Sequence, residues 1–196
     1  CGINDNIGFA GLAQIKKDAL ARTPNVALVD AGDAIQGAPI GKLSRGLAVV
    51  DIMNYLGYDF CIPGNHEFDY GMDRFMELVP LQRAGYYCAN FVYAGNNKQV
   101  LPGYKIMQYE DTKVAFVGAS TPESLTTSTP TFFQNEKGQY IYSFCEDKSG
   151  SKLYKQLQKN VDKARKEGAD YVFIVGHLGM DGTTPQWSSE SVAKNT

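Results

Sequence analysis

The chain has 196 residues, of which 43% are hydrophobic and 20% are charged, and its formal net charge is −2. These values are typical of one globular domain with a substantial core. The lack of a basic excess argues against nucleic acid as a partner. No apolar run reaches the ~18–20 residues needed to span a bilayer, so no membrane span is expected.

The first third of the chain alternates between predicted helices and predicted strands. Apolar residues at helical spacing predict a helix over residues 8–22, followed by an apolar strand over residues 26–30. A second helix is predicted over residues 43–56, and residues 58–62 form the next strand. Helices alternating with strands are typical of parallel strands covered by helices, so we predict an α/β fold.

The middle of the chain continues this rhythm once and then changes. Residues 72–84 are predicted to be helical, and residues 86–91 are predicted to be a strand. Two alternating stretches, at residues 103–108 and 113–119, predict a hairpin that turns at Glu110.

The last third begins with a segment rich in Thr, Ser and Pro, residues 121–138, for which we predict a long loop. Residues 140–145 read as a strand and residues 151–167 as an amphipathic helix whose lysines form a solvated face. The last predicted strand covers residues 171–175, and a loop follows over residues 179–187.

The four cysteines are widely spaced and form no Cys-x-x-Cys pair, which excludes a zinc finger and a dithiol redox motif. Cys61 and Cys88 lie in apolar, strand-like stretches, which favours buried free thiols. A disulfide is the alternative, so the cysteines do not fix the compartment of the protein.

Three polar motifs directly follow predicted strands. They are Gly-Asp-x-x-x-Gly at residues 32–37, Gly-Asn-His-Glu-Phe-Asp at residues 64–69, and Gly-His at residues 176–177. Ligands of α/β sheets bind where the carboxyl ends of strands meet. We therefore expect three side chains to cluster at one edge of a single sheet, namely Asp33, Asn65 and His177. A carboxylate, a carboxamide and an imidazole suit Zn, Mn, Fe or Mg.

Each of these residues also has an ordinary structural role as its alternative. Asp33 could cap a turn or the helix that follows it. Asn65 could occupy a left-handed turn next to Gly64. His177 could be a hydrogen-bonded histidine of the core or of a turn. The occurrence of all three motifs in one chain favours the metal site.

Together, the three motifs resemble those of the calcineurin-like metallophosphoesterases, and in particular their 5'-nucleotidase/UDP-sugar hydrolase branch. The resemblance spans nearly the whole chain and implies a sandwich of two mixed β-sheets flanked by helices. The opening Asp-x-His motif and the late Gly-His-x-His motif of the family do not occur here. We therefore expect residues 1–196 to be an incomplete catalytic domain that is cut at both ends.

The resemblance implies hydrolysis of phosphate esters, with nucleotides as substrates, by a hydroxide that two divalent ions (Zn, Mn or similar) activate. Asp33 would bridge the ions, and Asn65 and His177 would bind the second ion. His66 would face the phosphate as a proton donor, with Asp69 as the partner of its imidazole. Asn65 and His66 are thus also the predicted substrate contacts.

The other residues of these motifs are interpreted as structural. Glu67 is expected to serve the turn rather than the chemistry. Gly32, Gly37 and Gly64 are expected to allow a positive φ or a close approach of backbone segments.

The resemblance leaves the substrate open among 5'-nucleotides, 2',3'-cyclic nucleotides, UDP-sugars and sulfur-bearing esters. It implies a C-terminal substrate-binding domain in the parent protein and an extracellular, cell-wall or periplasmic location. Because only Asp33 remains for the first ion, we expect this chain to hold at most one ion weakly and to be inactive by itself. The alternative is a non-catalytic fragment or a degenerate metal-binding module. No Gly-x-Ser-x-Gly or Walker motif supports another hydrolase class.

Overall fold

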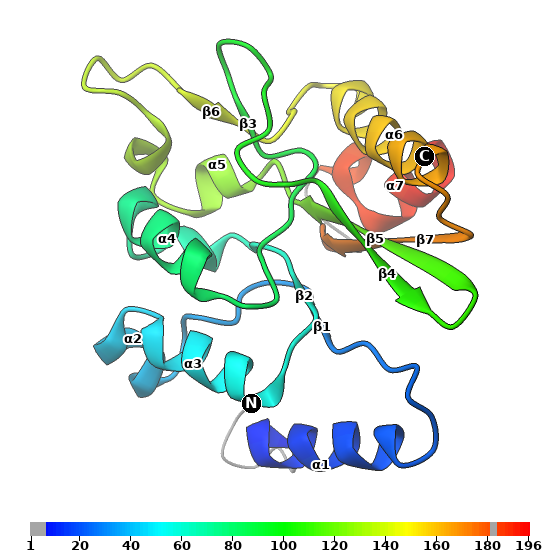
Figure 1. Cartoon of the computed structure of the whole chain (residues 1–196). Helices are drawn as coiled ribbons and strands as arrows, with labels where there is room; N and C mark the ends of the chain where they lie inside the picture. The colour runs from blue at the N-terminus through cyan, green and yellow to red at the C-terminus, as the bar shows by residue number, and fades with distance from the viewer. Residues whose placement is uncertain (1–6, 181–183) are drawn as a thin grey trace.

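The computed structural model describes residues 7–180 and 184–196, and Figure 1 labels its helices and strands. The helices are α1 (Gly8–Leu20), α2 (Pro39–Ser44), α3 (Leu47–Leu56), α4 (Met72–Leu78), α5 (Ser124–Thr127), α6 (Ser151–Lys166) and α7 (Ser189–Asn195). None of these described helices is long and apolar enough to cross a membrane. The strands are β1 (Val29–Asp30), β2 (Phe60–Cys61), β3 (Val92–Tyr93), β4 (Tyr104–Tyr109), β5 (Thr112–Ser120), β6 (Tyr142–Ser143) and β7 (Tyr171–His177). Short 3-10 helices cover His66–Phe68, Val79–Leu81, Pro130–Phe133 and Pro185–Trp187.

The described strands pair in three groups. β1 is parallel to β2, β3 is antiparallel to β6, and β5 lies between antiparallel β4 and parallel β7. The predicted α/β class is confirmed, and so is the hairpin of β4 and β5, which turns at Glu110. The prediction that β1, β2 and β7 share one sheet is wrong, because β7 pairs with β5.

A segment between α4 and β3 joins the β1–β2 pair to the sheet of β4, β5 and β7. Tyr87 N donates to the Cys61 carbonyl of β2, and Ala89 N donates to the Gly118 carbonyl of β5, each at 2.8 Å. The segment therefore changes partner within two residues. This is why the strand predicted over residues 86–91 is not formed as a regular strand.

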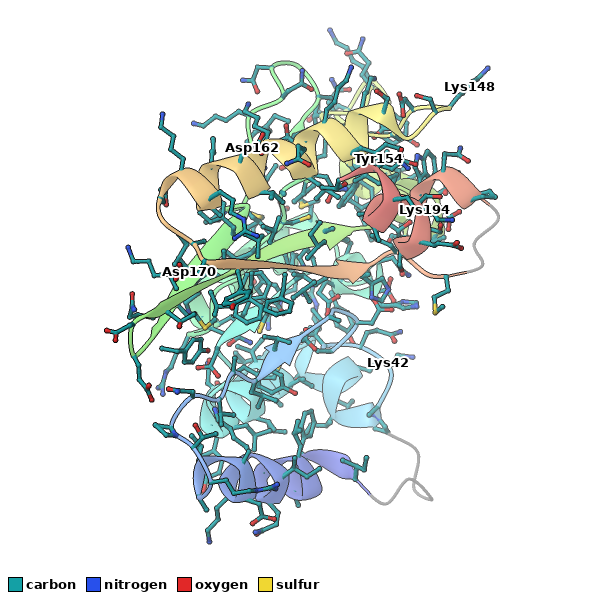
Figure 2. All side chains as sticks on the ribbon, turned by 90° about the vertical axis from the view of Figure 1, so that its right-hand side faces the viewer. Lys42, Lys148, Tyr154, Asp162, Asp170 and Lys194 are labelled. Carbon is teal, nitrogen blue, oxygen red and sulfur yellow. The ribbon has the colours of Figure 1, made fainter. Side chains whose placement is uncertain are left out.

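Helices α6 and α7 lie on one side of the sheet of β4, β5 and β7 (Figure 2). The buried stripe of α6 includes Leu153 and Leu157, which pack with Val117 and Ala119 of β5. Each buried leucine contributes about 1.5–3 kcal/mol relative to an exposed one. The sequence pattern does not predict α7, whose Val192 joins the same cluster.

A cluster of phenylalanines forms the core on the other side of the molecule. The ring of Phe68 makes edge contacts with four other rings at centroid distances of 4.9–5.7 Å, from Phe75, Phe91, Phe133 and Phe144. All five side chains are fully buried. Because Phe68 belongs to the second motif, this core anchors the loop that carries the predicted site.

The helix predicted over residues 43–56 is interrupted. Arg45 has a φ of 48° and Gly46 a φ of 86°, so α2 ends at Ser44 and α3 begins at Leu47. Two successive left-handed residues cannot continue a right-handed helix. The apolar spacing runs across the break, and for this reason the pattern does not reveal it.

The segment predicted as a long loop, residues 121–138, contains α5 and the 3-10 helix Pro130–Phe133. Pro130 stands in the first turn of this helix, where a missing N–H costs nothing, and Phe133 is fully buried. The segment is therefore tied to the aromatic core.

The predicted first helix is confirmed as α1, but α1 buries none of its residues. The ammonium group of Lys16 donates to the carbonyls of Leu56 and Gly57 at the end of α3. The last carbonyls of a helix lack partners within the helix, and the ammonium group supplies one.

Candidate active site

The first two motifs lie against each other at the ends of β1 and β2. Gly32 has a φ of 92°, and a Cβ at this position would overlap the backbone of Gly64. A Cβ on Gly64 would in turn overlap the carboxylate of Asp33, which itself has a φ of 64°. Together with Gly37, whose φ is 115°, these contacts confirm that the glycines permit positive φ or close approach.

Glu67 holds the two motif loops together from inside. Its fully buried carboxylate accepts hydrogen bonds from the backbone N of Asp33 (2.7 Å), Ala34 (2.7 Å), Ile35 (3.3 Å) and Gly64 (2.6 Å). Burial raises the pKa of Glu67 to about 7, whereas these hydrogen bonds favour the ionised form. The expectation that Glu67 serves the turn is confirmed.

The structure brings the three predicted ligand residues together. Nε2 of His177 lies 3.1 Å from Oδ2 of Asp33 and 3.2 Å from Oδ1 of Asn65. His177 is the last residue of β7, while Asp33 and Asn65 follow β1 and β2. The residues therefore meet at one place although their strands belong to different sheets.

The donor atoms of this trio fit a divalent cation. Nδ1 of His177 lies 2.9 Å from the carbonyl oxygen of Ala31, which holds the proton of a neutral imidazole on Nδ1. Nε2 then presents a lone pair to the same point as Oδ2 of Asp33 and Oδ1 of Asn65. Three acceptors that face one another without a shared proton favour a bound cation.

Without a cation, a protonated His177 stabilises the same arrangement, because its Nε2–H then faces the oxygens of Asp33 and Asn65. The hydrogen bond with Asp33 raises the pKa of His177 above its usual value, although burial opposes this. Burial raises the pKa of Asp33, but the hydrogen bonds from His177 and from the backbone N of His66 outweigh it and leave the pKa low. The pair is thus an ion pair that a metal would replace.

His66 and Asp69 form the predicted contact beside the trio. Nδ1 of His66 lies 2.7 Å from Oδ2 of Asp69, and this hydrogen bond raises the pKa of His66. The backbone N of His66 donates to Oδ1 of Asp33 at 2.8 Å. His66 therefore contacts Asp33 of the trio through its backbone and Asp69 through its imidazole, and its side chain is 46% exposed.

The described residues contain no group of three or more His, Cys, Asp and Glu side chains placed to hold a metal ion. The trio has two such side chains and completes its set with the carboxamide of Asn65.

Asp30 is a neighbouring carboxyl group that lies outside the three sequence motifs. It accepts from Gly32 N at 3.1 Å, and burial raises its pKa to about 6. Its place at the end of β1, two residues before the first motif, is the one signal that points to it.

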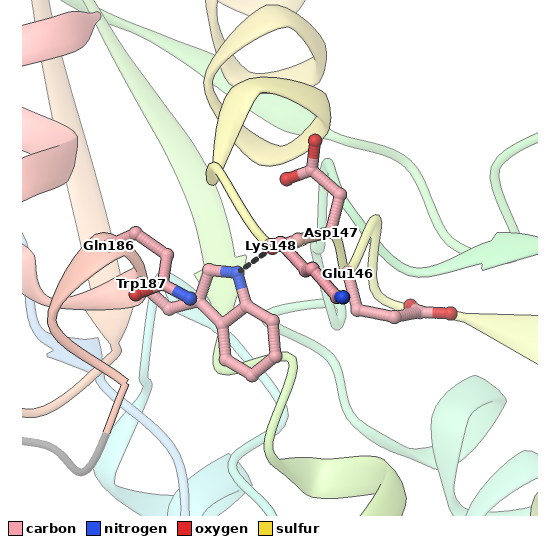
Figure 3. A pocket seen from close by; sticks show the side chains of 5 residues that line it. All are labelled: Glu146, Asp147, Lys148, Gln186 and Trp187. Atoms are coloured by element: carbon pink, nitrogen blue, oxygen red, sulfur yellow. Dashed lines mark hydrogen bonds between the residues drawn. The ribbon is translucent and has the colours of Figure 1, made fainter.

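Two cavities lie outside this constellation. One, of about 270 Å³, is lined by Glu146, Asp147, Lys148, Gln186 and Trp187 (Figure 3). The indole N–H of Trp187 donates to the Asp147 carbonyl at 3.2 Å there. The other, of about 450 Å³, lies between β7 and α7. No predicted site residue lines either cavity.

Cys61, Cys88 and Cys145 are buried and free, which confirms free thiols for the first two. Cys1 lies outside the described residues. Burial raises the pKa of Cys145 to about 12, and it also raises the pKa of Cys88. These thiols are therefore protonated at neutral pH and act as small apolar side chains.

Comparisons with known proteins agree with this geometry. A sequence model described as calcineurin-like phosphoesterase matches residues 3–195. The chain is 32% identical to the 5'-nucleotidase of Rattus norvegicus over 88% of its own length and 28% of that protein. It is 26% identical to the 2',3'-cyclic-nucleotide 2'-phosphodiesterase/3'-nucleotidase of Haemophilus influenzae, covering 96% of the chain and 30% of that protein. Thus the chain spans less than a third of the length of these relatives.

The solved structures show the same fold. The calcineurin-like phosphoesterase YfkN from Bacillus subtilis superposes with a TM-score of 0.79 at 24% identity, covering 98% of this chain and 61% of that one. The match of the family model to nearly the whole sequence decides the assignment. This chain belongs to the calcineurin-like phosphoesterase family.

Proposed function

We propose that the protein to which this chain belongs hydrolyses phosphate esters, and that its substrates are nucleotides. The convergence of Asp33, Asn65 and His177 on one point is the observation that carries the proposal. Family membership supports the reaction class, and relatives named as a 5'-nucleotidase and a cyclic-nucleotide phosphodiesterase support the substrate class.

In this proposal the three converging side chains hold a divalent cation such as Zn or Mn. A bound cation supplies Lewis-acid stabilisation of the phosphate and activates the attacking water. Calcineurin-like phosphoesterases are generally dinuclear. Asp33 would serve both ions in this proposal, because a carboxylate has two oxygens that can each act as a ligand.

His66 and Asp69 act on the substrate. Nδ1–H of His66 donates a hydrogen bond to Asp69, which leaves Nε2–H of the imidazolium to donate to a phosphate oxygen or to the leaving group. The half-exposed imidazole is open to a substrate from solvent. Asn65 lies next to His66 in the same loop, so these two residues are the proposed substrate contacts.

The nucleotide class remains a choice among 5'-nucleotides, 2',3'-cyclic nucleotides and UDP-sugars, with the 5'-nucleotidase reaction as our proposal. A C-terminal domain of the parent protein would supply the remaining substrate contacts, and an extracellular, cell-wall or periplasmic location goes with this role. The second candidate is a non-catalytic metal-binding module. It is favoured only by the small number of metal-ligating groups among the described residues.

Metal titration and substrate assays test the proposal. The full-length protein is titrated with Mn²⁺ by calorimetry and assayed with AMP, 2',3'-cyclic AMP and UDP-glucose. We expect AMP hydrolysis that depends on Mn²⁺, and loss of both binding and activity in Asp33→Asn and His177→Ala. Asp111→Asn, at an exposed hairpin turn, is the matched control and should behave as the unchanged protein. Metal binding without hydrolysis of any of the three substrates would support the binding module instead.

A further inference from the structure

Ser120 ends β5 at the point where the two halves of the site meet. It is fully buried, and its Cα pairs with that of His177 in the parallel ladder of β5 and β7. Its hydroxyl donates to the carbonyl of Pro63, two residues before Asn65. Ser120 is thus hydrogen-bonded to the loop that carries Asn65 and is paired with His177 in the neighbouring strand.

Asn90 fixes Ser120 in turn. The side chain of Asn90 accepts from Ser120 N at 3.1 Å and donates to Ser120 O at 2.8 Å, and it also donates to the Phe144 carbonyl at 2.9 Å. The thiol of Cys88 donates to the Ser120 hydroxyl oxygen at 3.3 Å. Asn90 is fully buried, so these bonds are not shared with solvent.

We propose that Ser120 is a positioning residue that sets the distance between Asn65 and His177. The proposal rests on the proposed function, in which both residues bind one cation. β2 and β7 belong to different sheets, so no continuous ladder fixes their separation. Within the described residues, the Ser120 hydroxyl makes the only hydrogen bond from the β5–β7 pair to residues 63–65, apart from the contact of His177 with Asn65.

This role has a consequence for metal binding. Ligands of one ion must share a coordination shell of about 2.0–2.2 Å, so a small displacement of Asn65 weakens the site. Loss of a residue that orients a ligand costs roughly 10–100-fold in metal affinity. A serine that merely satisfied a buried carbonyl would change stability without changing the affinity for metal.

The chain offers a matched control for this distinction. Ser124 is also fully buried, but its hydroxyl has no hydrogen-bond partner within the described residues. Ala164→Gly serves as a second control, because it destabilises α6 at a buried site outside the two motif loops.

The experiment compares Ser120→Ala with Ser124→Ala and Ala164→Gly in this chain. Calorimetry with Mn²⁺ gives the affinity, thermal unfolding gives the stability, and metal-free NMR follows the nuclear Overhauser effect between the His177 ring and the Asn65 side-chain amide. We expect Ser120→Ala to lose the Overhauser contact and about tenfold or more in affinity. Ser124→Ala and Ala164→Gly should keep the contact and bind Mn²⁺ as the unchanged chain does.

The two readouts separate this inference from the proposed function. If the unchanged chain shows the contact but no metal affinity, the metal-site proposal fails while a loss of the contact in Ser120→Ala still supports positioning. If Ser120→Ala keeps the contact, or if Ala164→Gly loses as much affinity at equal stability, the positioning role is wrong.

Discussion

Glu67 is the residue on which both motif loops depend. Backbone N–H groups of Asp33, Ala34 and Ile35 from the first loop and of Gly64 from the second converge on its carboxylate. A carboxylate can accept all of these bonds because it carries only acceptor sites. A protonated carboxyl group would turn its own O–H toward one of these backbone N–H donors.

Glu67→Gln is therefore expected to lower the free energy of unfolding by about 2–4 kcal/mol, since its amide turns N–H groups toward backbone donors. Urea denaturation measures the change. Glu77→Gln is the control, because the Glu77 side chain is 63% exposed and pairs with Arg74 on the surface of α4. Its effect should stay within about 1 kcal/mol. Equal losses of stability in the two variants would show that the hydrogen bonds of Glu67 to the two motif loops contribute nothing to the free energy of unfolding.

His66 and Asp33 should separate chemistry from metal binding in the full-length protein. His66→Ala is expected to lower turnover on the order of 10²–10⁴-fold, the usual contribution of a positioned proton donor, and to keep the metal. Asp33→Ala should lose both, because it removes the proposed bridge. Turnover and metal content by atomic absorption check this pair. Metal loss in His66→Ala would mean that His66 is a ligand instead.

At the scale of elements, β5 and the segment after α4 approach each other so closely that only glycine fits between them. A Cβ at Gly118 would overlap the carbonyl of Tyr87 and lie 2.9 Å from Cγ2 of Ile62. Ile62 directly precedes Pro63 and the second motif, so this contact also sets how closely the second motif approaches β5.

Gly118→Ala should thus destabilise the protein by about 1–3 kcal/mol, the usual cost of overpacking, and should weaken Mn²⁺ binding. Gly95→Ala is the matched control, because nothing lies within 4 Å of its added Cβ. Thermal unfolding and calorimetry of both variants decide the matter. An unchanged melting temperature for Gly118→Ala would show that the two segments can separate without cost.

The elements that the sequence predicts well are those whose signals are local. α6 and the hairpin of β4 and β5 follow from side-chain periodicity, and the meeting of Asp33, Asn65 and His177 at one place follows from motifs placed directly after predicted strands. The residues that hold the site in place cannot be predicted in this way. Glu67 and Asp33 are 34 residues apart, and Ser120 and Pro63 are 57 residues apart. No local pattern encodes these contacts, nor the change of partner that puts β7 in a different sheet from β2.

At the scale of the whole molecule, the candidate site lies between two separately paired groups of strands. Asp33 and Asn65 come from the β1–β2 side, and His177 comes from the sheet of β4, β5 and β7. A cation bound between them would link the two groups and stabilise the folded state according to its concentration relative to Kd.

We therefore expect this chain by itself to bind at most one Mn²⁺ ion weakly and to hydrolyse AMP at a rate near background. Three ligand groups form an open site that can hold an ion, but one shared carboxylate cannot hold a second ion against water. At a concentration 100-fold above Kd, Mn²⁺ should add about 2.7 kcal/mol to the stability, and Asp33→Asn should abolish this gain. Calorimetry gives the stoichiometry, and thermal unfolding with and without Mn²⁺ gives the linkage. Two tightly bound ions per chain, or turnover equal to that of the full-length protein, would show that the described trio is not the whole of the metal site.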